Sequence, residues 1–110
     1  MTVQNLIDDF SLEVLCCGGM AAKKEVKGGY CGDLLSWVMS KANEGDCWLT
    51  VMGNVNSIGV AVLTDVACIL LTENAAFDDD AKLRAEQNSV IVLRSNENAF
   101  DLAVKIAEKI

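Results

Sequence analysis

The side chains of this chain that could bind a ligand are short polar ones placed directly after apolar runs. In open α/β sheets, ligands bind outside the carboxyl ends of the strands, where helix N-termini present backbone N–H groups. Five residues form the candidate ligand-binding site: Asp33, Ser36, Asn54, Asn56 and Thr72. Hydroxyls, amides and a carboxylate of this kind suit a nucleotide, a phosphate or a carboxylate. Helix caps and turns need the same residue types without a ligand, so both interpretations stay open.

Catalytic groups are scarce. The chain has no histidine, which excludes Ser-His-Asp and Cys-His arrangements. It has neither GxxxxGK[ST] nor GxGxxG, the patterns of P-loop and standard dinucleotide-binding proteins. We therefore expect no enzyme and no cofactor. The open alternative is a Mg²⁺-assisted phosphoryl-transfer accessory, in which Asp33, Glu73 and the acidic run 78–80 hold the cation with a ligand's phosphates. The acidic run is also typical of a helix start.

The cysteines show no metal-binding or redox motif. There are five, with no CxxC among them: Cys16, Cys17, Cys31, Cys47 and Cys68. We expect reduced and largely buried thiols. Cys31 lies near an expected helix N-terminus, which would lower its pKa and make it the most reactive thiol. Cys16 and Cys17 are consecutive in an expected strand, so their side chains should point to opposite faces.

Composition narrows the class of protein and of partner. The 110 residues are 52% hydrophobic, which fits one domain over residues 1–110. A net charge of −7 makes binding to nucleic acid or to an anionic membrane improbable. No apolar run approaches the ~18 residues of a membrane span. The first ten residues lack the features of a secretory signal, so we expect a cytoplasmic protein.

Hydrophobic periodicity predicts alternating helices and strands. Helices are expected at 2–9, 33–44, 55–65 and 78–87, and from Ser95 or Asn96 onward. Strands are expected at 12–17, 47–52, 67–71 and 89–93, with a short strand or loop within 22–30. Asp33 is the expected N-cap of the second helix. The last helix should bury five apolar residues: Ala99, Leu102, Ala103, Ile106 and Ile110. Apolar strands separated by helices predict an α/β fold, a small three-layer sandwich with a mostly parallel sheet flanked by helices.

Apolar residues exceed what a small domain can cover. An apolar face that helices do not cover is usually buried against a partner, so we expect a homodimer. Trp37, if exposed, would be a natural anchor for that contact.

Three segments carry a family resemblance. The stretch Gly29-Tyr30-Cys31-Gly32-Asp33-Leu34-Leu35-Ser36-Trp37-Val38-Met39, the strand entry 44–50 and the asparagine-led helix 56–65 resemble the stand-alone DRTGG-domain family. That family is similar to the N-terminal domain of HPr kinase/phosphorylase and to domains of some phosphotransacetylases and CBS-domain pyrophosphatases. The resemblance implies a regulatory α/β domain that senses a ligand or mediates dimer contacts. Its stand-alone members often lie beside iron-only hydrogenase genes.

The chain departs from the family at one loop. Where the family has Thr-Gly-Gly, this chain has Thr72-Glu73-Asn74. Glu73 would repel an anionic ligand, and a backbone with positive φ becomes costlier without glycine.

These observations lead to one hypothesis and its rivals. The chain is expected to be a non-enzymatic, cytoplasmic regulatory or ligand-sensing module that acts as a homodimer and binds a nucleotide or another phosphate-containing small molecule. The alternative from another class is a structural adaptor for a hydrogenase or signalling protein partner, which would show no small-ligand effect.

Overall fold

The computed structural model describes all residues 1–110 as alternating helices and strands. The helices are α1 (Val3–Phe10), the 3₁₀ helix η1 (Gly18–Lys23), α2 (Leu35–Lys41), α3 (Val55–Thr64), α4 (Asp79–Asn88) and α5 (Ala99–Ala107). The strands are β1 (Glu13–Cys16), β2 (Gly28–Cys31), β3 (Asp46–Thr50), β4 (Cys68–Leu71) and β5 (Val92–Arg94). Each long helix and apolar strand expected from periodicity is present, with boundaries that differ by a few residues.

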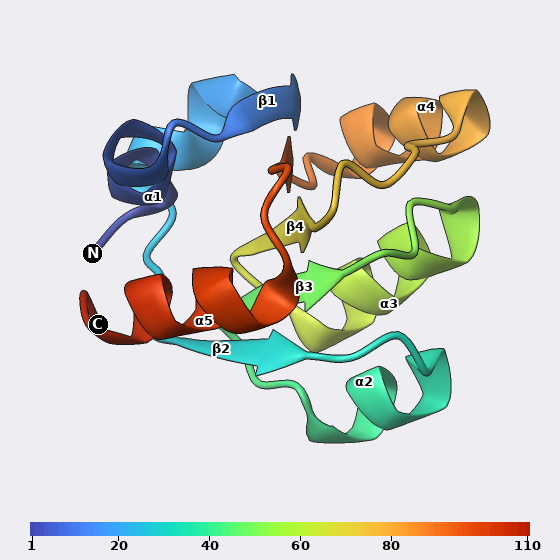
Figure 1. The fold of residues 1–110 in the computed structure, drawn as a ribbon. Helices are drawn as coiled ribbons and strands as arrows, with labels where there is room; N and C mark the ends of the chain where they lie inside the picture. The colour runs from blue at the N-terminus through green and yellow to red at the C-terminus, as the bar shows by residue number, and fades with distance from the viewer.

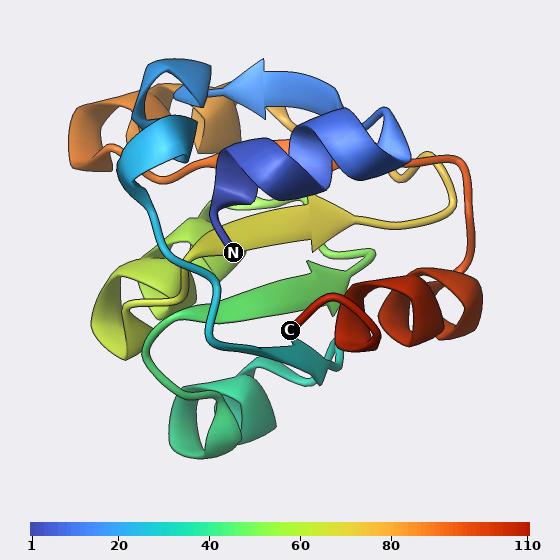
Figure 2. The same cartoon turned by 90° about the vertical axis from the view of Figure 1, so that its left-hand side faces the viewer.

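The five strands form one sheet in the order β1-β5-β4-β3-β2. Strands β2 to β5 pair in parallel, whereas β1 pairs with β5 in the antiparallel sense. Figure 1 shows α2, α3 and α4 on one face of the sheet and α1 and α5 on the other. In Figure 2, α1 and α5 lie in front of the strands, and both chain termini lie on that side. The predicted α/β sandwich with a mostly parallel sheet is therefore confirmed.

Each face of the sheet has its own apolar core, because alternate residues of a strand point to opposite faces. Trp48 and Ile69 pack under α2, α3 and α4, together with residues such as Ile58. Leu49 and Leu70 pack under α1 and α5. The indole of Trp48 donates a hydrogen bond of 2.9 Å to the Gly32 carbonyl, so even its polar atom is satisfied.

Two predictions about helix α5 are wrong in detail. The helix is capped by Asn98, whose side chain accepts a hydrogen bond from the Asp101 N–H, rather than by Ser95 or Asn96. Of its predicted core residues, Leu102 and Ile106 are buried, but Ile110 is 50% exposed because it lies beyond the last helical turn. Asparagine at either 96 or 98 satisfies the same capping rule, so the sequence alone did not distinguish them.

The prediction that Cys16 and Cys17 point to opposite faces is also wrong. The pairing of β1 with β5 shifts between Val14 and Cys16. Cys17 then leaves the strand in a left-handed conformation, with φ 60° and ψ 31°. The two sulfur atoms consequently lie 3.1 Å apart.

The acidic run at 78–80 begins a helix, as expected. Asp79 and Asp80 lie in the first turn of α4, where their charge complements the helix dipole. None of the helices is long and apolar enough to span a membrane.

Candidate functional site

Asp33 does not cap helix α2, which corrects the sequence-based prediction. The capping position belongs to Leu34, which makes no side-chain cap bond. Asp33 Oδ1 instead accepts hydrogen bonds from the Thr50 hydroxyl, at 2.7 Å, and from the Val51 N–H, at 2.9 Å. Since Thr50 ends β3, this carboxylate fastens the β2–α2 connection to the end of the neighbouring strand.

Thr72 begins the loop that leaves β4. It is buried, and its N–H donates to the Thr50 carbonyl at 3.1 Å. Glu73 and Asn74 follow with φ of 55° and 53°. Their N–H groups donate to the carbonyls of Glu97 and Ser95, at 2.9 and 2.8 Å. The loop therefore adopts the left-handed backbone that favours glycine, and it uses those two N–H groups internally.

A polar hollow of about 250 Å³ lies at the carboxyl ends of β3 and β4. Asp33, Thr72 and Glu73 line it, together with Thr50 and Cys31. The structure thus brings two of the five predicted site residues, Asp33 and Thr72, to one place. Two carboxylates beside this hollow make it unfavourable for an anion.

Ser36 and Asn56 line a different hollow. It lies between α2 and α3, which pack side by side (Figure 1), and has a volume of about 560 Å³. Its walls are largely apolar, with Met39 and Leu63 among them. Arg84, from α4, adds a guanidinium group at this groove. We call this hollow the α2–α3 groove.

Sequence analysis missed Arg84. The residue lies in the middle of a helix with no motif around it, and only the packing of α4 against α3 brings it to the groove. A positive side chain there changes the chemistry of the groove, because a guanidinium is the group best suited to bind phosphate.

Asn54 lines neither hollow. Its side chain caps α3 by accepting a hydrogen bond of 3.1 Å from the Ser57 N–H. The next residue back, Gly53, is where the β3 and β4 loops touch: a Cβ atom there would clash with the Ala76 carbonyl oxygen. Glycine at this position allows the two loops to approach closely.

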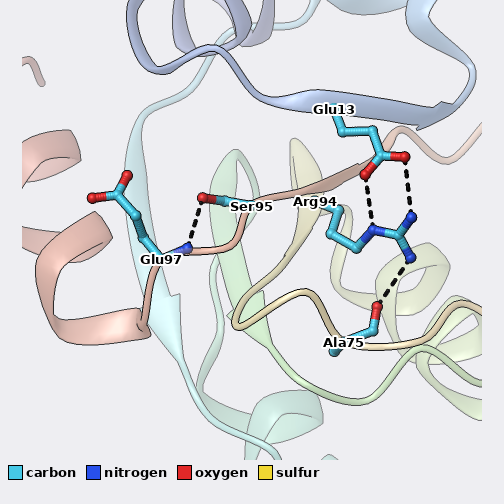
Figure 3. A network of polar contacts seen from close by, with 5 residues as sticks. All are labelled: Glu13, Ala75, Arg94, Ser95 and Glu97. Carbon is cyan, nitrogen blue, oxygen red and sulfur yellow. Dashed lines mark hydrogen bonds and ion pairs between the residues drawn. The ribbon is translucent and has the colours of Figure 1, made fainter.

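A charged network ties the β4 loop to strand β1. Figure 3 shows Arg94 of β5 with a bidentate ion pair to Glu13, at 2.9 and 3.0 Å, and a third bond of 3.2 Å to the Ala75 carbonyl. In the same view, the Glu97 N–H donates to the Ser95 hydroxyl at 3.1 Å. Hydrogen bonds from Arg94 lower the pKa of Glu13. The guanidinium of Arg94 is thus bonded to Glu13 and to the Ala75 carbonyl.

The structure bears on the predicted reactivity of Cys31. Cys31 is exposed, but partial burial and the nearby Asp33 charge raise its pKa, so the expected lowering is wrong. Helix α2 begins only at Leu35, so Cys31 does not lie in its first turn. No group of three or more Cys, Asp or Glu side chains is placed to hold a metal ion.

Comparisons with known proteins agree with the fold. The family model of the DRTGG domain matches residues 5–109. Among solved structures, the chain is similar to the CBS and DRTGG domains of the regulatory region of Clostridium perfringens pyrophosphatase, complexed with its activator, diadenosine tetraphosphate. The TM-score is 0.71 at 13% identity, over 99% of this chain and 47% of that one. This chain therefore spans about half the length of that solved chain. None of the curated protein sequences matches.

Proposed function

Because the chain belongs to the DRTGG-domain family, we propose that it is a regulatory module that binds a nucleotide and catalyses no reaction itself. A solved structure that shares its fold is a regulatory region complexed with a dinucleotide activator. We propose further that residues 1–110 act as one domain, as a homodimer in the cytoplasm.

The α2–α3 groove carries this proposal. A volume of about 560 Å³ lies within the roughly 300–1,000 Å³ of small-molecule sites. Its polar groups are the Ser36 hydroxyl, the Asn56 amide and the Arg84 guanidinium, and Asn56 lies in the first turn of the ten-residue helix α3. A guanidinium and the positive end of a helix dipole favour a phosphate. The apolar walls suit the face of a base.

Asp33 and Thr72 would contact uncharged parts of the ligand. Asp33 and Glu73 would repel a phosphate placed at the polar hollow. Hydroxyl groups, such as those of a ribose, can instead donate to the second oxygen of Asp33. In this proposal Asp33 and Thr72 orient the ligand, whereas Ser36, Asn56 and Arg84 hold its phosphate. Asn54 acts indirectly, because it caps α3, the helix that carries Asn56.

Thermal unfolding tests the binding proposal. The protein is heated alone and with adenine or guanine nucleotides, diadenosine tetraphosphate, acetyl phosphate or Mg²⁺. A ligand at 100 times its Kd adds about 2.7 kcal/mol to the free energy of unfolding, which raises the Tm visibly. Arg84→Gln should weaken nucleotide binding about tenfold or more, since it removes a charged hydrogen bond worth ~1.5–3 kcal/mol. Lys82→Gln, on the same helix but outside the groove, should not.

Two results would contradict the proposal. If the Arg84→Gln and Lys82→Gln variants bind nucleotide with equal affinity, the phosphate does not bind in the α2–α3 groove. No Tm shift with any nucleotide would favour the adaptor interpretation, in which the chain binds a protein partner alone.

The proposed dimer contact is the outer face of α2. Trp37 is 58% exposed, and Leu34, at the start of the helix, is 60% exposed. The Lys41 ammonium lies 4.9 Å from the centre of the Trp37 ring. Aromatic residues with this exposure are common anchors of interfaces. Light scattering after size exclusion should show a dimer that Trp37→Ser dissociates. Phe100→Ser, which changes an aromatic side chain 77% exposed on α5, should leave the dimer intact. A monomeric wild-type protein would contradict the dimer.

A further inference from the structure

Cys16 and Cys17 hold their sulfur atoms 3.1 Å apart at the end of β1. Adjacent residues of a regular strand cannot do this, because their side chains point to opposite faces. Here the shift in pairing after Val14 and the left-handed backbone of Cys17 turn both thiols to the same side. A non-glycine residue in this conformation is uncommon, so the juxtaposition is a specific feature of the fold.

The two thiols differ in their access to solvent. Cys16 is 5% exposed and belongs to the core beneath α4. Burial and the neighbouring Cys17 raise the pKa of Cys16 to about 12. Cys17 is only partly buried, and its thiol donates to the Ala85 carbonyl at 3.7 Å. Cys17 is thus the more exposed of the two residues, and the Cys16 sulfur lies 3.1 Å from its own.

We propose that Cys16 and Cys17 are a site of reversible oxidation, at which hydrogen peroxide converts the two thiols to a disulfide between adjacent residues. The Cys17 thiolate attacks one peroxide oxygen; the O–O bond breaks, one water leaves, and Cys17 becomes a sulfenic acid. The Cys16 sulfur then attacks the Cys17 sulfur, the S–O bond breaks, and a second water leaves. The two thiol protons end in the two waters, and the thiols lose two electrons to the peroxide.

The other cysteines show what the site requires. Cys47 and Cys68 face each other on β3 and β4, with sulfur atoms 3.7 Å apart, but both are fully buried. Attack on a peroxide needs an accessible thiolate, which this pair does not offer. Cys31 is exposed, yet its sulfur has no partner of this kind. Of the five cysteines, the adjacent pair alone combines access with a neighbouring thiol.

The product should be easy to reduce. Adjacent Cα atoms are ~3.8 Å apart, closer than the ~4.4–6.8 Å usual for a disulfide. Such a disulfide stores strain, and strained disulfides are the readily reduced ones. A small dithiol should therefore restore both thiols.

The test is peptide mass mapping of the full chain after hydrogen peroxide, with free thiols alkylated under denaturing conditions. We expect the peptide that carries Cys16 and Cys17 to lose two hydrogens and to take up no alkyl group, and dithiothreitol to reverse this. Cys47 and Cys68 should stay fully alkylable. Cys31→Ser should behave as the wild type does.

Single substitutions identify the order of the steps. Cys16→Ser should leave a Cys17 sulfenic acid that dimedone traps, whereas Cys17→Ser should leave Cys16 reduced. The proposal is overturned if both thiols of the wild-type pair remain alkylable at peroxide doses that oxidise Cys31. It is equally overturned if Cys47 and Cys68 form their disulfide first. The wild-type mapping decides the matter even where a variant fails to fold.

Discussion

The loops that leave the neighbouring strands β3 and β4 are held in opposite ways. A side chain holds the first: Asp33 accepts from the Thr50 hydroxyl and the Val51 N–H. The backbone holds the second, since the N–H groups of Glu73 and Asn74 donate to carbonyls of the β5–α5 connection. At the strand end itself, a carboxylate holds the first loop, whereas two backbone N–H groups hold the second, to which Arg94 adds a bond at Ala75.

The two loops also differ in backbone strain: the β4 loop is strained and the β3 loop is not. Glu73 and Asn74 both have positive φ, whereas Thr50, Val51 and Met52 do not. A non-glycine residue in the left-handed region costs of order 1–3 kcal/mol, less for asparagine than for other residues. The β4 loop thus keeps the conformation that two glycines would adopt freely, and its hydrogen bonds to the β5–α5 connection offset the strain.

Removing the Asp33 carboxylate should have the largest effect. Asp33→Ala leaves the buried Thr50 hydroxyl without its acceptor, and we expect the free energy of unfolding to fall by about 2 kcal/mol. Asp33→Asn retains one carbonyl oxygen and should lose less than half of that. Urea titration at pH 7 measures both. Equal stability of Asp33→Ala and the wild type would show that the β3 loop does not depend on this carboxylate.

Relieving the strain at Glu73 should have a smaller effect of the opposite sign. Glu73→Gly should raise the free energy of unfolding by about 1 kcal/mol, because glycine adopts positive φ without a steric penalty. Glu73→Ala is the matched control: it removes the carboxylate but retains the Cβ atom, so it should bring no gain. A similar gain in both variants would identify charge, rather than backbone strain, as the cost of Glu73.

The sequence predicted the layers of the fold and the types of residue at the strand ends. Runs such as Cys68–Leu71 are wholly buried, which periodicity can detect. Their helical neighbours follow from apolar spacing. For Asp33, by contrast, a capping rule predicts a role at the nearest helix, because the rule considers only residues close in the chain. Its actual partner, Thr50, lies 17 residues away, and only the pairing of β2 with β3 brings it close.

The candidate site was predicted as one place and is divided between two. Strand ends meet at one edge of the sheet, which predicts that the five residues converge there. In the structure, Asp33 and Thr72 line the polar hollow, while Ser36 and Asn56 line the α2–α3 groove. Ser36 and Asn56 each lie in the first turn of a helix, and the strand order carries no information about which hollow such a residue will line. Arg84 was missed for the same reason, since it lies on a third helix.

The smallest predicted effect concerns Arg94, which fastens the β4 loop through Ala75 but does not contact the β3 loop. Hydrogen bonds from Arg94 hold the pKa of Glu13 below its usual 4.5 in the folded protein. Glu13 therefore contributes stability above the unfolded-state pKa, and this contribution is lost as the pH falls through the lower, folded-state value. Glu13→Gln should be slightly less stable than the wild type at pH 7, and the difference should disappear in acid. Urea titrations from pH 7 downward measure it, with Glu108→Gln, which changes an exposed glutamate outside this pair, as the control.

Amide hydrogen exchange at pH 7 should show faster exchange for Glu73 and Asn74 in Glu13→Gln, and unchanged exchange for Val51. Equal acceleration of both loops would mean that the ion pair supports the whole sheet edge, and the contrast between the two loops would then not hold.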